Sequence, residues 1–233
     1  MKNILCLSIA LAAFSLPALA EDIMPTGPQV AVAPLAAERP DGPASAPAVS
    51  NGRSEQDQQT IARVQDYLNN IRTLKAEFMQ TLSNGSTTNG TLFIKRPGKM
   101  RLQYAPPNRD LLVADGTFVH AWDSQAHTSS SVPLGRSLAD IILRDPLKLS
   151  GDIRVKEVRY YPQMLEIDIT QANDPASGTL TLELQDNPLQ LKNWRVKDGQ
   201  GVMTRVSLYN EQVNQDIPGS TFAYKDPSFG HLH

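Results

Sequence analysis

Side chains that could carry out chemistry are sparse in this chain of 233 residues. The four histidines are His120, His127, His231 and His233, and no two have the i, i+4 spacing that places both rings on one helix face. The only cysteine is Cys6. Because the usual Cys and His ligands are so few and no dense acidic cluster lies beside them, we expect no dedicated metal site.

Acid–base and nucleophilic chemistry have little more support. Asp115, His120 and Asp123 are close in sequence and could form an acid–base pair. However, Asp115-Gly116 is a hairpin-turn dipeptide, which explains this aspartate better. The GxSxG elbow, GxGxxG and GxxxxGK[ST] patterns are absent. We therefore expect no enzyme and no cofactor, and a hydrolase with unrecognised residues is the alternative that ester turnover would reveal.

One charged residue, Arg96, lies at the end of an apolar strand face. By strand parity it shares that face with Leu92 and Ile94, and Pro97 favours an extended backbone before it. A guanidinium has five donors and no acceptor, so at the mouth of an apolar pocket it would bind carbonyl oxygens left unpaired at a helix terminus. In the alternative interpretation, its stem covers apolar surface while its head reaches water.

The elements around these residues alternate apolar and polar side chains with period two, which is typical of strands. A polar loop is expected at 84–89, and turn dipeptides such as Asn187-Pro188 separate the later strands. The expected strands are 74–79, 90–96, 100–104, 110–114, 117–122, 153–161, 164–171, 178–184, 190–197, 202–209 and 221–224.

Two segments instead show helical signals. Ser54 with Asp57 three residues later resembles a capping box and predicts a helix over about 55–72. Ser137 with Asp140 has the same spacing and predicts a short helix over 137–144. The apolar stripe of this second helix consists of Leu138, Ile141 and Ile142.

These elements predict a mainly β fold with some α structure (α+β). About eleven strands joined by hairpins make an antiparallel sheet, and so many strands in one domain should curl into a barrel or part-barrel. Two helices are too few to cover both faces of this sheet, but they could close one side. We expect a container for something apolar rather than an active site.

The N-terminal region has the features of a secretory signal peptide over 1–20, with Lys2, an apolar run and Ala18-Leu-Ala20 before the cleavage point. An Ala- and Pro-rich linker follows over 21–53, and the folded domain is expected over 54–233. Because Cys6 leaves with the signal, the exported chain is cysteine-free, which fits a bacterial periplasm. A net charge of −2 gives no basic surplus for binding nucleic acid.

Several short motifs, in this order, resemble the outer-membrane lipoprotein carrier protein (LolA) family over about residues 60–227. The motifs are Phe78-x-Gln80, Gly90-Thr-Leu-Phe-Ile-Lys-Arg-Pro97, Tyr104-x-x-Pro107, Val113-Ala-Asp-Gly116, Asp198-Gly-Gln-Gly201 with Thr204-Arg-Val, and Phe222-Ala-Tyr.

This resemblance implies an open antiparallel half-barrel with a helical lid over an apolar cavity, and no bond chemistry. It implies a monomeric periplasmic shuttle that accepts triacylated lipoproteins from an inner-membrane ATP-driven transporter and delivers them to an outer-membrane receptor. Arg96 matches the family arginine that controls the lid. Met100 occupies a position where many relatives carry an aromatic residue. The residues expected to line the acyl cavity are Phe78, Leu92, Ile94, Met100, Leu102, Ile141 and Ile142.

Two other proteins of this fold are alternatives. The outer-membrane receptor of the same pathway is itself a lipoprotein, and this chain has no cysteine placed for lipidation. A periplasmic sensor that binds mislocalised lipoproteins and a protein partner carries a further domain, for which the length leaves no room.

Overall fold

A computed structural model describes residues 53–227 of the protein; the predicted signal peptide, and the linker apart from Arg53, lie outside this range. The first element is α1 (Glu55–Asn69), whose predicted cap is confirmed because Asp57 N donates to Ser54 Oγ over 3.1 Å. Its buried face includes Val64 and Leu68. No helix in the described part of the chain is long and apolar enough to cross a membrane.

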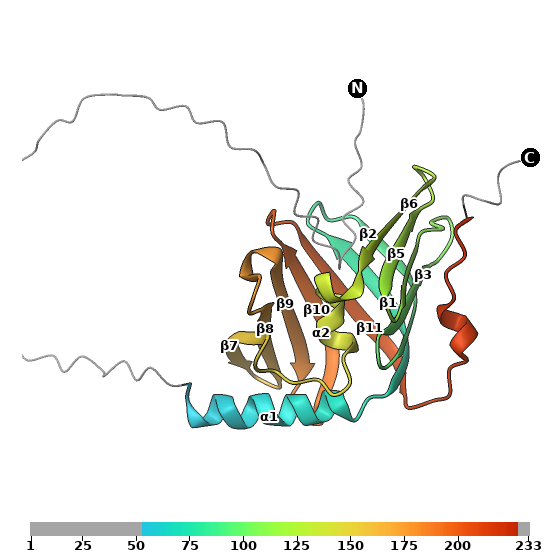
Figure 1. Ribbon diagram of the computed structural model, residues 1–233. Coiled ribbons are helices and arrows are strands. Elements are labelled where there is room, and N and C mark those ends of the chain that lie inside the picture. The colour runs from blue at the N-terminus through green and yellow to red at the C-terminus, as the bar shows by residue number, and fades with distance from the viewer. Residues whose placement is uncertain (1–52, 228–233) are drawn as a thin grey trace, which may run out of the picture.

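Eleven antiparallel strands follow, which confirms the predicted fold class (Figure 1). The strands are β1 (Thr73–Leu82), β2 (Thr87–Lys95), β3 (Lys99–Tyr104), β4 (Leu111–Asp115), β5 (Phe118–Asp123), β6 (Thr128–Pro133), β7 (Ile153–Tyr161), β8 (Met164–Gln171), β9 (Gly178–Gln185), β10 (Gln190–Asp198) and β11 (Met203–Val213). Their order in the sheet is β6-β5-β4-β3-β2-β1-β11-β10-β9-β8-β7.

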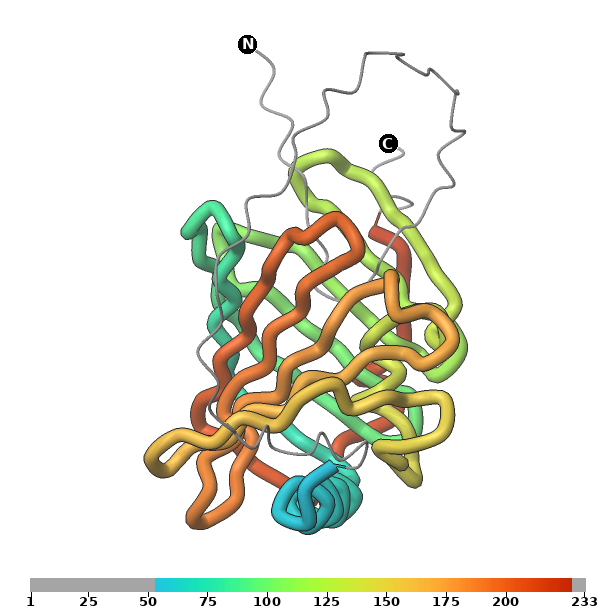
Figure 2. Tube along the Cα trace, turned by 90° about the vertical axis from the view of Figure 1, so that its left-hand side faces the viewer, coloured from blue at the N-terminus to red at the C-terminus, as the bar shows by residue number. Residues whose placement is uncertain are grey.

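The barrel is open because β6 and β7 form the two edges of the sheet. The chain passes from β6 to β7 through a short 3-10 helix (Leu134–Arg136) and α2 (Ala139–Leu143). The strands curve around α2, and α1 runs across the strand ends at one rim (Figures 1 and 2). In a complete barrel, backbone hydrogen bonds would join the two edge strands. Here β6 and β7 are instead connected through α2.

The number of strands equals the predicted number, but one predicted strand is absent and one observed strand was not predicted. The Ser-rich β6 was not predicted, because an exposed edge strand has no apolar alternation to mark it. The predicted strand over 221–224 is wrong: Gly219–Phe222 forms a 3-10 helix that lies against β3 and β4. The predicted loop over 84–89 is also too long, since β2 already begins at Thr87.

The second helix was placed correctly but capped wrongly. It begins at Ala139, and Ser137 does not cap it, because the Ser137 hydroxyl donates to the carbonyl oxygen of Leu134 over 2.9 Å. The Ser137 side chain, which the spacing assigned to the N-terminus of the helix, is therefore bonded to the preceding 3-10 helix instead.

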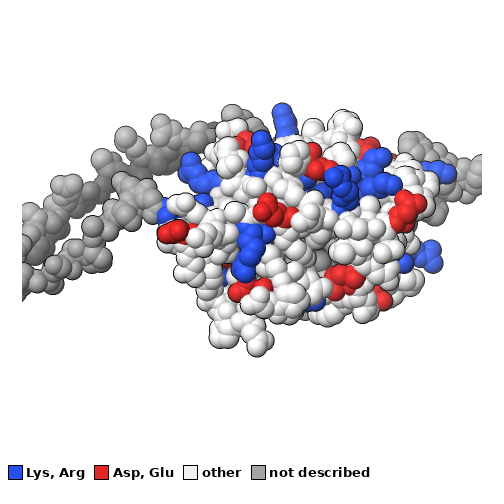
Figure 3. All heavy atoms as spheres, turned by 90° about the horizontal axis from the view of Figure 1, so that it is seen from below, with Lys and Arg blue, Asp and Glu red and all other residues white. Residues whose placement is uncertain are grey.

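The outer face of the sheet carries ion pairs on the half that contains β9 and β10. The segment that follows β11 packs against the other half. Glu183 on β9 is buried and pairs with Arg195 on the neighbouring β10 and with Arg205 on β11, one strand further on. On the other half, the residues after β11 bury Ile217 and Phe222. Seen from the side on which α1 lies, acidic and basic side chains are interspersed (Figure 3).

Candidate functional site: the apolar interior and its helical cover

The concave face of the sheet is apolar, and all seven residues expected to line a cavity lie in its one large buried cluster. Their side chains come from β1, β2, β3 and α2, and each residue is at most 7% exposed. On neighbouring strands Leu92 pairs with Leu102, and Ile94 pairs with Met100. The alternation thus brings these side chains to the same face, as the period-two pattern indicated.

A glycine shapes one part of this face. Phe78 on β1 lies opposite Gly90 on β2, and a Cβ added to Gly90 would lie 2.9 Å from the Phe78 ring and 2.1 Å from the backbone oxygen of Gln103. The missing side chain lets the ring lie across the strand, where it meets Tyr104 edge-on at 5.3 Å. The Tyr104 hydroxyl donates to Gln80 over 2.7 Å, so its polar end is satisfied.

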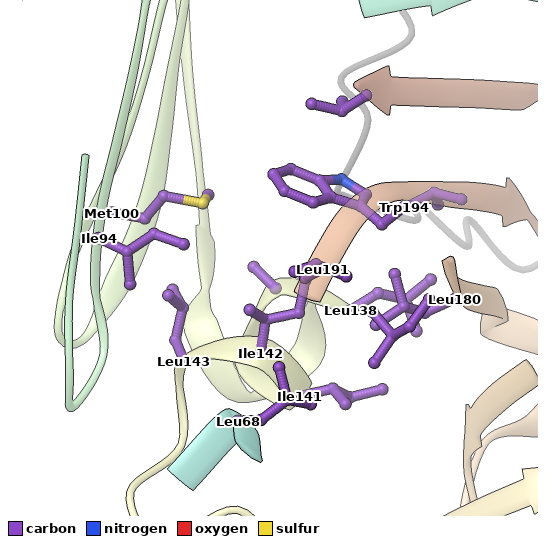
Figure 4. Packing of buried hydrophobic residues seen from close by; sticks show 14 of the residues in the cluster. Leu68, Ile94, Met100, Leu138, Ile141, Ile142, Leu143, Leu180, Leu191 and Trp194 are labelled. Carbon is purple, nitrogen blue, oxygen red and sulfur yellow. The ribbon is translucent and has the colours of Figure 1, made fainter. Parts of the chain in front are cut away.

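The short helix α2 occupies the interior of the half-barrel. Figure 4 shows Leu138, Ile141, Ile142 and Leu143 between Ile94 and Met100 on one arm of the sheet and Trp194 on the other. Since α2 is only five residues long and four of them are buried, it is held by side-chain packing rather than by its own helical stability. The side chains of α2 therefore fill the space between the two arms of the sheet.

Arg96 connects the sheet to the end of α1. It is the first residue after β2, and its Nη1 donates to the carbonyl oxygen of Leu68 in the last helical turn over 2.7 Å. Burial lowers the pKa of Arg96 to about 10, against the opposing effect of Asp145, so the group is still charged at neutral pH. Its Nε is buried without a partner among the described residues. The guanidinium thus binds a helix-terminal carbonyl, although it lies past the strand rather than on its face.

The same β2–β3 turn also binds α2. Gly98 N donates over 2.9 Å to the carbonyl oxygen of Leu143, the last residue of that helix. Gly98 has a φ of +76°, and an added Cβ would lie 3.0 Å from Gly116 Cα, so both the conformation and the close approach favour glycine. A cavity of about 380 Å³ lies between this turn, Leu134 and the end of α2. One turn therefore holds the C-terminal ends of both helices.

Side-chain amides of α1 bind the segment that follows α2, which sequence reasoning missed. Asn69 donates to the carbonyl oxygen of Leu147 and accepts from its N–H, and Gln65 accepts from Leu149 N. Tyr67 accepts from Leu191 N on β10 over 2.9 Å. These contacts join α1, α2 and the sheet rim, and we call α1 and α2 together the helical cover.

The acid–base candidates lie outside this interior. His120 Nε2 is 3.0 Å from Asp115 Oδ2, His120 Nδ1 is 2.7 Å from Ser131 Oγ, and the ring stacks on Tyr224 at 4.5 Å. Asp123 instead accepts from the backbone of its own turn. The stacking of His120 on Tyr224 attaches the C-terminal segment to β5, which gives His120 a structural role. In residues 53–227, no three His, Cys, Asp or Glu side chains could share a metal ion.

The fold is thus an open antiparallel half-barrel with an apolar interior, a short helix inside it and a longer helix across one rim. The family model for "Outer membrane lipoprotein carrier protein LolA" matches residues 69–225, and the chain belongs to this family.

Two relatives named outer-membrane lipoprotein carrier protein support this membership. The one from Dechloromonas aromatica is 27% identical over 72% of this chain and 84% of its own length. The one from Azotobacter vinelandii is 26% identical over 78% of this chain and 92% of its own length. Among solved structures, a LolA superfamily protein from Nitrosomonas europaea is 8% identical over 71% of this chain and 97% of its own, with a TM-score of 0.41.

Proposed function

We propose that the protein is a periplasmic, non-enzymatic carrier of triacylated lipoproteins. It takes them from an inner-membrane ATP-driven transporter, holds their acyl chains within the half-barrel and delivers them to an outer-membrane receptor. The supporting observation is that the interior of the half-barrel is apolar, lined by Phe78, Leu92 and Met100, and is filled by α2, a helix of only five residues.

The energetics explain why such a carrier is needed. Each acyl CH₂ exposed to water costs roughly 0.8 kcal/mol, so three long chains left in water would cost tens of kcal/mol. In this proposal α2 moves aside on loading, and the ligand replaces the apolar contacts that α2 gives up. The free protein and the loaded protein then both keep the interior dry.

Arg96 sets the balance between the two states in this proposal. Its bond to Leu68 exists only while α1 stays against the sheet, so it favours the covered state without contacting the ligand. Ligand binding has to overcome this preference, and release recovers it.

The test is detergent-free purification of the protein from a periplasm, followed by native mass spectrometry. We expect acylated cargo to co-purify with the wild-type protein and to be absent from Met100→Glu, which places a charge in the interior. Met79→Glu is the matched control, because Met79 lies on the outer face of β1 and is 37% exposed. An empty wild-type protein that also takes no lipoprotein from the transporter would overturn the proposal.

A further inference from the structure

The two edges of the sheet differ in how they are protected against pairing with another strand. An edge strand presents unpaired N–H and C=O groups, and proteins protect such edges with charged side chains, bulges or covering groups. The edge strand β7 has all three protections. Four of its side chains are charged, its ladder has a bulge between Val155 and Glu157, and the carbonyl oxygen of Val155 accepts from the guanidinium of Arg53.

The other edge strand, β6, lacks these protections. Its sequence, Thr-Ser-Ser-Ser-Val-Pro, contains no charged side chain, and it pairs with β5 without a bulge. Thr128, Ser129 and Ser131 are exposed. The β5–β6 hairpin projects at the rim opposite α1 (Figure 1), so β6 is an accessible edge that borders the gap in the half-barrel.

The pairing of β6 with β5 shows which of its backbone groups are free. Leu134 N donates to the carbonyl oxygen of Thr117 just past the end of this pairing, so alternate residues counted back from Leu134 bond to β5. The residues between them, Ser129 and Ser131, therefore direct both N–H and C=O away from the sheet. In the described residues 53–227, no hydrogen bond reaches these backbone groups.

The chemistry of this edge favours an extended segment of a protein partner. Outward N–H and C=O groups bind a strand through its backbone. A second copy of this chain is less suitable, because two six-residue strands, about 20 Å long and about 10 Å thick, bury only roughly 400 Å² in total. Stable complexes bury about 1,200 Å² or more. Such a small contact suits a partner that binds briefly.

The side chains of β6 limit the composition of the partner segment. Val132 packs against the large buried cluster, and Ser130 lies on the same side of the strand. In an added strand, every second side chain would extend this inner side. A charged side chain there would be brought against the apolar interior, whereas a small or apolar one would not. The edge therefore favours an uncharged segment.

We infer that β6 docks an extended, uncharged segment of a protein with which the carrier exchanges its cargo, through the backbone groups of Ser129 and Ser131. The inference rests on the proposed function and names the surface that a transport partner binds. Because β6 leads through Leu134–Arg136 into α2, the docked segment would lie beside the part of the chain that moves when the interior opens.

The first test uses a peptide probe with blocked ends, Thr-Val-Thr-Val-Thr-Val, added to the ¹⁵N-labelled protein. We expect saturable shifts of the amide signals of Ser129 and Ser131, and slower hydrogen exchange at both. Replacing the three valines of the probe by lysine should weaken its binding about tenfold. Shifts on β7 instead, or no saturable shift at Ser129 and Ser131, would overturn the inference.

Ser131→Pro and Ser131→Ala are the matched variants. Both remove the contact between the serine hydroxyl and His120, but only proline also removes the outward N–H. Binding of the probe, and the rate of cargo exchange with the transporter and the receptor, should fall about tenfold in Ser131→Pro and stay near wild type in Ser131→Ala. Equal behaviour of the two variants contradicts the inference.

Thr128→Lys is a second variant, which keeps the test decisive if Ser131→Pro does not fold. It places on β6 the kind of charge that protects β7, so probe binding should fall about threefold, and unchanged binding contradicts the inference. Self-association of the wild-type protein that Thr128→Lys abolishes would identify a second copy as the occupant and overturn the inference. Probe binding by a protein that takes up no lipoprotein overturns the proposed function alone, whereas lipoprotein exchange at wild-type rates in Ser131→Pro overturns the docking edge alone.

Discussion

Arg96 Nη1 donates a 2.7 Å hydrogen bond to the carbonyl oxygen of Leu68, 28 residues earlier in the chain. This bond joins the β2–β3 turn to the last turn of α1. Because Gly98 of the same turn binds the end of α2, movement of this turn would be transmitted to both helices of the cover.

Arg96→Leu should loosen the cover without unfolding the protein. The substitution removes a buried charge together with one hydrogen bond, so the free energy of unfolding should change by no more than about 1 kcal/mol. Hydrogen exchange at the C-terminal amides of α1 should accelerate, and hand-off of cargo to the receptor should slow. Unchanged transfer kinetics would contradict the role assigned to Arg96.

Met100→Ala should weaken the interior. Met100 is 1% exposed within the large cluster, so truncation should lower the free energy of unfolding by about 2–4 kcal/mol, measured by urea denaturation. Met79→Ala on the outer face should change it by less than about 0.5 kcal/mol. Equal losses in the two variants would show that the concave face is not the core.

Glu183→Gln should destabilise the half of the sheet formed by β7–β11. The carboxylate is buried between Arg195 and Arg205, and Glu183→Gln removes the negative charge that the two guanidinium groups share, while Arg195 keeps its ion pair with Glu166. A loss of about 2 kcal/mol is expected, less than for a fully buried pair because both arginines reach solvent. Glu77→Gln, at an exposed position bonded to Asn210, is the control and should be near neutral.

Asp115 should contribute to stability at acid pH. Burial alone would raise its pKa, but bonds from Phe118 N and Thr117 N, together with His120, hold the pKa at about 2. A lowered pKa gives stability that is present above the unfolded value near 3.8 and is lost as the pH falls towards 2. Urea denaturation between pH 2 and 7 should show this loss in the wild-type protein and a smaller one in Asp115→Asn.

The alternation of apolar residues was sufficient to predict ten of the eleven strands, because burying one face of a sheet leaves a period-two signal. It failed at β6, whose serines are exposed or half-buried and show no apolar alternation. It also failed at 221–224, where Phe222 is buried by lying over the outer face rather than by joining the sheet.

The residues of the candidate site could be predicted only where the type and spacing of side chains in the sequence indicate their position. Leu92, Ile94 and Met100 could be assigned to one face from parity. The preference of Arg96 for a helix-terminal carbonyl followed from its chemistry, but the particular partner is a backbone atom of Leu68 that only the fold brings near. The contacts of Asn69 and Gln65 with the segment after α2 were not foreseen either, because their partners are backbone atoms from a distant part of the chain.

The position of α2 between the two edge strands has a kinetic consequence. Since the chain fixes α2 at both ends, its displaced form cannot diffuse away and stays at a high effective concentration beside the interior it left. An emptied protein should therefore close by itself, faster than a second molecule of cargo arrives, and without any source of energy. In the proposed carrier, the direction of transport would then depend on which partner the open protein meets.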